Sequence, residues 1–312
     1  MVEQTITPNI VIVGVTKAGS TSLFTYLSDH PDVCGSTIKE VSHFVTVRFG
    51  EPARPIKNYT QYFSHCRHQR YRLESSPAYF FGNRELAETM KSALNDVKVI
   101  IMLREPVSRC LSHFRFSKNM LKLPKDMKLD EYFQKCQEMP YEAFLKRQSY
   151  VYYGLASGIY SNYIEGWIET FGENLHICFF DDLKRDSHQF SKNLCQWLDI
   201  DETFYDDYNF VVENMGRDYH KANLQKLVLK FNKSFEGFFR RNIQIKRVLR
   251  NLYFAINGIG SNVQIDMNES ATIAKMREYY APHNKRLRAQ LLKANVQSLP
   301  EWLETAKVDK SI

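Results

Sequence analysis

The feature of this sequence that most constrains its fold is a short apolar run that ends in a glycine-rich turn. Residues 10–13 are Ile, Val, Ile and Val, and Gly14 follows them. A continuous β-branched run of this kind is typical of a strand that is buried on both faces of a parallel sheet. Apolar side chains then recur at helical spacing as far as Leu27, and Pro31 ends the pattern. This stretch therefore predicts a strand, a loop and a helix.

The same order of elements recurs further along the chain. Residues 97–103 read VKVIIML, and Pro106 then suits the first position of a helix. A third strand is expected at residues 175–180, which read LHICFF. Strands that alternate with helices predict a parallel sheet that is covered on both faces and that binds ligands at the carboxyl ends of its strands.

We expect one α/β domain over residues 1–312, with a central parallel β-sheet flanked by helices. The stretches at about 116–153 and 221–262 are rich in aromatic and basic residues and show no strand pattern. We interpret them as helical insertions over the site. No repeat or low-complexity linker divides the chain.

Composition narrows the class of protein only slightly. The net charge of +7 suits an anionic partner but is common for 312 residues. No apolar run approaches the roughly 20 residues that a membrane-spanning helix needs, and the first residues show no secretion signal. The six cysteines lack disulfide-framework or metal-ligand spacing, so we expect reduced, structural thiols in a cytoplasmic protein.

Residues 14–21 read GVTKAGST and lie between the predicted strand and helix. Successive backbone N–H groups in such a loop form a concave anion site together with the helix N-terminus. A nucleotide-triphosphate P-loop places lysine directly before the hydroxyl residue that binds magnesium. Here Lys17 lies two residues before Gly19, so the loop is similar to a metal-free relative of the kinase P-loop.

A second motif begins at the carboxyl end of the second predicted strand. Residues 104–112 read REPVSRCLS. Arg104 is expected in the same crevice as the first loop, where a guanidinium suits a terminal phosphate. Arg109 is expected to have a structural role.

These two motifs, KxGSTSL and RxPxxRxxS about ninety residues later, resemble the two motifs with which sulfotransferases bind 3′-phosphoadenosine-5′-phosphosulfate (PAPS). The resemblance implies the P-loop-like sulfotransferase fold and transfer of a sulfuryl group to a hydroxyl or amine, leaving adenosine 3′,5′-bisphosphate (PAP). It implies that Arg104 and Ser112 hold the 3′-phosphate. It also implies that one loop holds the 5′-phosphosulfate, formed by Thr16, Lys17, Ala18, Gly19, Ser20, Thr21 and Ser22.

Further stretches occur in the order that this family shows. They read KEVSHF at 39–44, ESSPAY at 74–79, GIY at 158–160 and YAPHNKRL at 280–287. The first is similar to the heparan-sulfate-type and bacterial branch, which implies Glu40 as the catalytic base and leaves His43 in reserve. Arg217 matches a later basic loop that closes over the 3′-phosphate.

Sulfuryl transfer is an in-line displacement that depends on positioning and electrostatics. Lys17 would follow the negative charge that builds on the leaving phosphate, so no metal is expected. Glu40, if buried beside the sulfate, would have a raised pKa suited to proton removal. The alternatives are a surface Glu40 paired with Lys39 or Arg48, and a packed His43 with one satisfied nitrogen.

Two other functions remain open at this point. A P-loop kinase that uses ATP and magnesium on a small metabolite would need lysine directly before Ser20. A basic nucleic-acid-binding protein would leave the two phosphate motifs unexplained. We therefore expect PAPS as co-substrate, a small molecule or natural product as acceptor, no nucleic-acid partner, and a monomer or homodimer.

Overall fold

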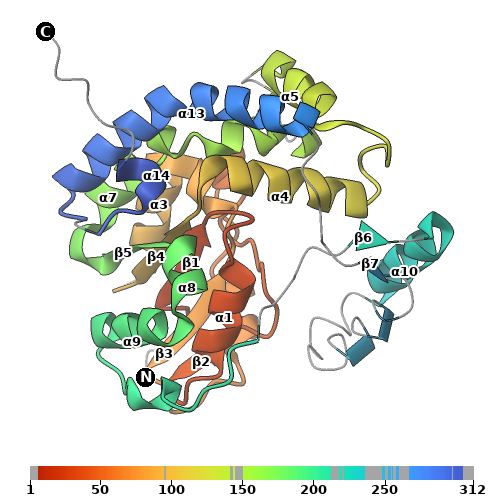
Figure 1. The fold of residues 1–312 in the computed structure, drawn as a ribbon. Coiled ribbons are helices and arrows are strands. Elements are labelled where there is room, and N and C mark those ends of the chain that lie inside the picture. The colour runs from red at the N-terminus through yellow and green to blue at the C-terminus, as the bar shows by residue number, and fades with distance from the viewer. Residues whose placement is uncertain are drawn as a thin grey trace, which may run out of the picture.

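The computed structural model describes residues 6–94, 96–140, 143–144, 150–211, 218–219, 221–235, 248–249, 252–253, 255, 258–259, 267–296 and 298–304. Within these residues the chain forms a parallel sheet of five strands that is flanked by helices (Figure 1). This confirms the expected α/β class. The strand order is β2 (Val33–Gly35), β3 (Tyr71–Ser75), β1 (Ile10–Gly14), β4 (Lys98–Leu103) and β5 (Leu175–Phe179).

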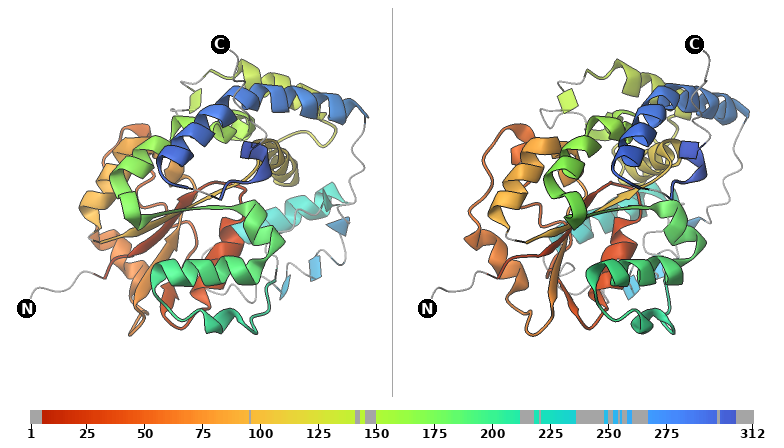
Figure 2. Two further views of the ribbon diagram at one scale, coloured as in Figure 1. Left: turned by 60° about the vertical axis from the view of Figure 1, so that its left-hand side comes forward. Right: turned by 90° about the vertical axis from the view of Figure 1, so that its left-hand side faces the viewer.

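Helices cover both faces of this sheet. Figure 2 shows α1 and α9 on one face and α3, α7 and α13 on the other. The helices are α1 (Ser20–Ser28), α2 (Lys57–Thr60), α3 (Asn83–Ala93), α4 (Pro106–Asn119), α5 (Leu129–Glu138), α7 (Ile164–Phe171), α8 (Phe180–Arg185), α9 (Ser187–Leu198), α10 (Ala222–Ser234), α13 (Met267–Lys293) and α14 (Glu301–Glu304). Burial on both sides explains why β1 and β4 lack polar alternation.

The central position of β1 follows from its composition. All five of its residues are buried, and it pairs in parallel with β3 on one side and β4 on the other. Because β1 and β4 are neighbours, the loops that follow them leave the same edge of the sheet side by side.

The two predicted insertions agree with the structure only in part. In the first, α4 continues to Asn119 and α5 and the 3₁₀ helix η4 (Tyr150–Gly154) follow. In the second, α10 is helical, but β7 (Gly258–Ile259) pairs antiparallel with β6 (Asp218–Tyr219). The prediction of a purely helical insertion was therefore wrong for β7.

The structure also corrects the expectation that all cysteines are reduced. Cys34 in β2 and Cys66, just after the 3₁₀ helix η2 (Gln61–Phe63), form a disulfide across a sequence separation of 32. The other four, Cys110, Cys136, Cys178 and Cys195, are buried free thiols. The sequence spacing of Cys34 and Cys66 does not predict this disulfide, because only the fold brings the two segments together. The bond closes a loop that contains residues 39–44.

Reduction of the Cys34–Cys66 bond should destabilise the protein, because it releases a loop of this length in the unfolded chain. The expected loss is roughly 3–4 kcal/mol, or about 5–10 °C in the thermal midpoint. Thermal unfolding with and without reductant measures it. The double variant Cys34→Ser/Cys66→Ser should unfold at one temperature under both conditions. Six titratable thiols in the unreduced, denatured protein would show that the bond does not form.

Candidate active site

The two sequence motifs meet at the carboxyl edge of β1 and β4. The backbone N–H of Val15 donates to the carbonyl of Met102 at 2.8 Å, so the strand pairing extends into the first loop. The Nη1 of Arg104 then donates to the carbonyl of Lys17 at 2.9 Å. One motif thus binds the other directly, and two cationic side chains lie at a shared edge.

Gly19 determines the shape of the first loop, which residues 14–21 form. It precedes α1 with φ of 88°, in the left-handed region that favours glycine. A Cβ atom at this position would approach the Phe180 ring to 2.7 Å. No side chain caps the start of α1, so the first amide groups of the helix remain available to an anion. Thr16, Thr21 and the buried Ser20 and Ser22 complete the loop, whose Ala18 is fully buried.

Lys17 has a strongly perturbed environment. Its φ is 69°, and its Nζ lies 4.2 Å from the centre of the Phe116 ring. Burial, reinforced by the positive charge of Arg104, lowers the pKa of Lys17 to about 8, while Glu40 opposes this shift. Two cations that destabilise each other beside uncapped amide groups fit a polyanionic ligand.

Arg104 is fixed by contacts on several sides. Its guanidinium carbon lies 4.6 Å from the centre of the Phe180 ring, and its carbonyl accepts a hydrogen bond from Tyr160 at 2.8 Å. Burial lowers the pKa of Arg104. The ring of Phe180 therefore contacts Arg104 while it also closes the space beside Gly19.

The rest of the second motif lies on α4. Glu105 caps this helix by accepting from the N–H groups of Val107 and Ser108 at 2.8 and 2.6 Å. Arg109 is fully buried and donates to the carbonyl of Gly154, which fits the structural role expected of it. Ser112 is half-buried on the same helix. Arg217 lies outside the described residues.

Glu40 occupies a strained and exposed position. Its φ is 62° and that of Ser42 is 56°, both unfavourable for residues with a side chain. The Glu40 side chain is 60% exposed, and its Oε1 lies 3.0 Å from Lys39 Nζ. The burial that we considered for Glu40 is therefore not observed, and the surface pair with Lys39 is. The charge of Glu40 nevertheless opposes the lowering of the Lys17 pKa.

His43 is packed rather than exposed. Its ring stacks on Tyr59 with 4.2 Å between centroids and 6° between planes. Burial, followed by the charge of Arg54, lowers the pKa of His43 to about 4, so the imidazole is neutral at pH 7. Its Nε2 has no hydrogen-bond partner in the described part of the chain. This agrees with the packed histidine that we weighed as an alternative.

Sequence reasoning assigned no role to several residues that the structure places here. Phe116 contacts Lys17, and Phe180 contacts Arg104. Burial raises the pKa of Tyr150, and the Thr16 side chain opposes this shift. Glu74 is fully buried beneath residues 39–44, and burial raises its pKa to about 7. Only Glu74 belonged to a recognised motif, ESSPAY, so the sequence held no signal for the three aromatic side chains.

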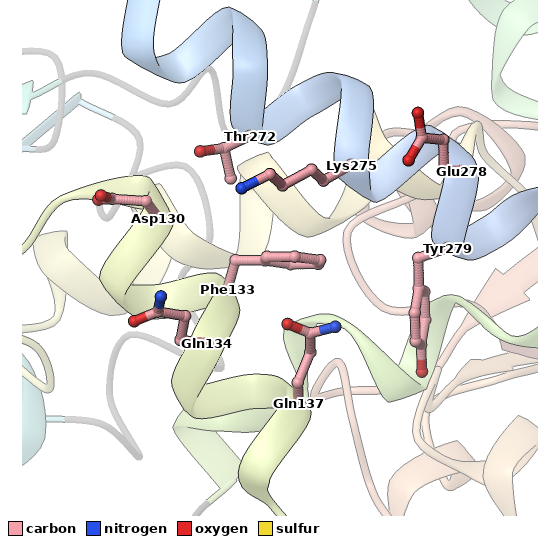
Figure 3. A pocket seen from close by; sticks show the side chains of 8 residues that line it. All are labelled: Asp130, Phe133, Gln134, Gln137, Thr272, Lys275, Glu278 and Tyr279. Atoms are coloured by element: carbon pink, nitrogen blue, oxygen red, sulfur yellow. The ribbon is translucent and has the colours of Figure 1, made fainter.

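A separate cavity of about 390 Å³ lies between α5 and α13 (Figure 3). Its lining includes Asp130 and Phe133 from one helix and Lys275 and Tyr279 from the other. No residue of the two phosphate motifs lines it, so it is distinct from the candidate active site.

Comparison with known proteins identifies the family. The chain matches the family model of the sulfotransferase domain over residues 7–247. A solved sulfotransferase from Alicyclobacillus acidocaldarius superposes with a TM-score of 0.58 at 25% identity, over 77% of this chain and 96% of that one. The chain therefore belongs to the sulfotransferase family, as the motifs predicted.

Curated relatives match over shorter stretches. A membrane-associated sulfotransferase, kil1, from Dictyostelium discoideum is 32% identical over 127 residues, which is 41% of this chain and 26% of that protein. Mouse heparan sulfate glucosamine 3-O-sulfotransferase 5 is 27% identical over 171 residues, 54% of this chain and 47% of that protein. The chain thus matches less than half the length of these relatives. No helix in the described residues is long and apolar enough to cross a bilayer.

The lowered pKa of Lys17 predicts how nucleotide affinity depends on pH. Above about pH 8 the free protein loses the Lys17 proton, while the phosphates of PAP are already fully ionised. The dissociation constant for PAP should therefore rise by up to about tenfold per pH unit. Calorimetric titration between pH 7 and 9.5 measures this. Lys17→Arg keeps its charge throughout and should bind evenly over that range; an equal decline in this variant would exclude Lys17 as the cause.

Proposed function

We propose that this chain transfers the sulfuryl group of PAPS to a hydroxyl or amine of an acceptor. The observation that carries the proposal is the direct contact of the two motifs, 2.9 Å between Arg104 Nη1 and the Lys17 carbonyl. It sets two half-buried cations at one edge of the sheet, which suits a nucleotide with phosphate at both its 3′ and 5′ positions. The resemblance of both motifs to those of sulfotransferases supports the same reading.

The kinase alternative lacks the lysine that it needs. A nucleotide-triphosphate P-loop has lysine directly before the hydroxyl residue, whereas here Gly19 precedes Ser20 and Ser20 precedes Thr21. The family match gives the kinase no support either.

PAPS supplies an activated sulfuryl group, and the residues described above would bind and orient it. The amides and hydroxyls of residues 16–22 would hold the 5′-phosphosulfate. Lys17 would stabilise the charge that develops on the departing phosphate oxygen. Arg104 and Ser112 would hold the 3′-phosphate, joined by Arg217. In this account the protein side chains supply the positive charge and no metal is needed.

Glu40 is our proposed base. A carboxylate that accepts a proton must be within reach of the attacking group, and Glu40 interacts electrostatically with Lys17 at the donor loop. Its backbone is held at a φ of 62°. Strain of this kind persists only where surrounding structure imposes it, and it is frequent in active sites. His43, neutral and stacked on Tyr59, would support the same segment.

We propose a small molecule or natural product as acceptor. The curated relatives named above include an enzyme of heparan sulfate glucosamine, but the match covers only 47% of that protein. The Cys34–Cys66 disulfide weighs against the cytoplasmic location that the sequence predicted, because thiol reductants in the cytoplasm keep most cysteines reduced.

Binding of PAP tests the proposed donor site most simply. Calorimetry should give the same affinity with and without magnesium, and ATP should compete poorly. Lys17→Ala and Arg104→Ala should each weaken binding by roughly 10–100-fold, since each removes charged hydrogen bonds. Tighter binding of ATP with magnesium would favour a kinase, and preference for a DNA or RNA oligonucleotide would favour the nucleic-acid alternative.

Replacement of Glu40 by Gln tests the proposed base. Turnover is measured as PAP release from PAPS with 4-nitrophenol, glucosamine or N-acetylglucosamine as acceptor. Glu40→Gln should lose roughly 10²–10⁴-fold in rate while it keeps its affinity for PAP. Glu85→Gln, an exposed glutamate on α3, is the matched control. Turnover retained in Glu40→Gln would assign proton removal to another group.

A further inference from the structure

Glu74 is an unusual residue to find at the end of β3. It is fully buried, and no lysine or arginine in the described residues forms an ion pair with it. Instead its Oε2 accepts from the Tyr59 hydroxyl at 3.0 Å and its Oε1 accepts from the Ser76 hydroxyl. An uncompensated buried carboxylate is costly, so its presence calls for a physical reason.

Both hydroxyl groups that bind Glu74 continue to the segment that carries Glu40. The Ser76 hydroxyl accepts from the backbone N–H of Ser42 at 2.9 Å. The Tyr59 ring stacks on His43. Residues 40–43 are therefore attached at two points to groups that the carboxylate of Glu74 orients.

Two further hydrogen bonds, both donated by backbone N–H groups, complete the attachment of this segment. The N–H of Glu40 donates to the carbonyl of Ser75 at 3.0 Å, and the N–H of Phe44 donates to the Tyr79 hydroxyl at 3.3 Å. Between these bonds lie Glu40 and Ser42 with their positive φ values of 62° and 56°. Such a conformation relaxes unless its surroundings hold it.

We propose that Glu74 is a positioning residue for sulfuryl transfer, whose ionised carboxylate holds residues 40–43, and with them Glu40, in the strained conformation beside the donor loop. This inference rests on the proposed function of Glu40. It adds a residue that touches neither donor nor acceptor.

The charge of Glu74 matters because of hydrogen-bond direction. The Ser76 hydroxyl has one proton, and an ionised Glu74 accepts it, which leaves the oxygen lone pairs free for the N–H of Ser42. The Tyr59 hydroxyl is oriented in the same way. When Glu74 is protonated, one of its oxygens carries a proton and donates a hydrogen bond. The hydroxyl of Ser76 or Tyr59 that donated to that oxygen must then reorient, which weakens the attachment of residues 40–43.

The groups that face Glu74 set the pH at which this change occurs. Burial raises its pKa to about 7, opposed by the hydrogen bonds from Ser76 and Tyr59 and by the charge of Lys39, and reinforced by Glu40. Tyr59 and Tyr79 also face it, and burial raises the pKa of both, so they stay neutral. Glu74 therefore changes charge around neutral pH directly beneath residues 40–43, whereas Lys17, with its pKa of about 8, lies on the neighbouring loop.

Hydrogen–deuterium exchange of residues 37–49 tests the proposal without an acceptor. After correction for the intrinsic pH dependence of exchange, protection in the unmodified protein should rise about threefold or more from pH 5.5 to 8.5. Glu74→Gln, which is neutral at every pH, should show low protection without this step. Ser76→Ala removes both a hydrogen bond to the ionised form and the acceptor for the Ser42 N–H, so its overall protection should be lower and its remaining step should move to higher pH. Glu85→Gln should behave like the unmodified protein.

Turnover and nucleotide binding separate this inference from the proposed function. With PAPS and the acceptors named above, Glu74→Gln should be about tenfold slower and lose its rate step near pH 7, while its PAP affinity stays within twofold. Unchanged exchange in Glu74→Gln, or an equal effect of Glu85→Gln, would overturn the positioning role. Failure of the unmodified protein to bind PAP would instead overturn the proposed function, and the exchange result would still decide whether Glu74 holds the segment.

Discussion

The hydrogen bond from Arg104 to the carbonyl of Lys17 is the contact on which the candidate site depends. It forms because β1 and β4 are parallel neighbours, so the loops after them leave the sheet together. Each loop then contributes one cation, and the charge of Arg104 destabilises that of Lys17. An anionic ligand would relieve that repulsion, which favours the proposed ligand with negative charge at two positions.

Several residues at this site have backbone conformations or buried charges that cost the folded protein free energy. Lys17, Glu40 and Ser42 have positive φ values, Lys17 has a lowered pKa, and Glu74 is a buried acid with a raised one. Because the pKa of Glu74 is raised in the folded protein, the contribution of this one group to the free energy of unfolding is fully present below about pH 4.5. That contribution is lost as the pH rises through about 7. Retention of costly features at one edge of the sheet is what a functional site predicts.

The sequence predicted those parts of the fold whose signal is local. The runs that form β1, β4 and β5 are mainly apolar, with Lys98 and His176 as exceptions, and their strands were anticipated. In contrast, β2 has three residues and β3 alternates apolar residues with Arg72 and Glu74, so neither contains the continuous apolar run from which the other strands were predicted. The disulfide, the contact of Phe116 with Lys17 and the burial of Glu74 depend on segments that only the tertiary structure brings together. The motifs predicted the two loops that meet at the edge of β1 and β4, whereas the network beneath residues 39–44 required the structure.

A crystal structure of the chain with adenosine 3′,5′-bisphosphate tests the central claim most directly. The account predicts one nucleotide across the two loops, with the Lys17 amine on its 5′-phosphate and the Arg104 guanidinium on its 3′-phosphate. A nucleotide bound elsewhere, or either side chain turned away from it, would contradict the account.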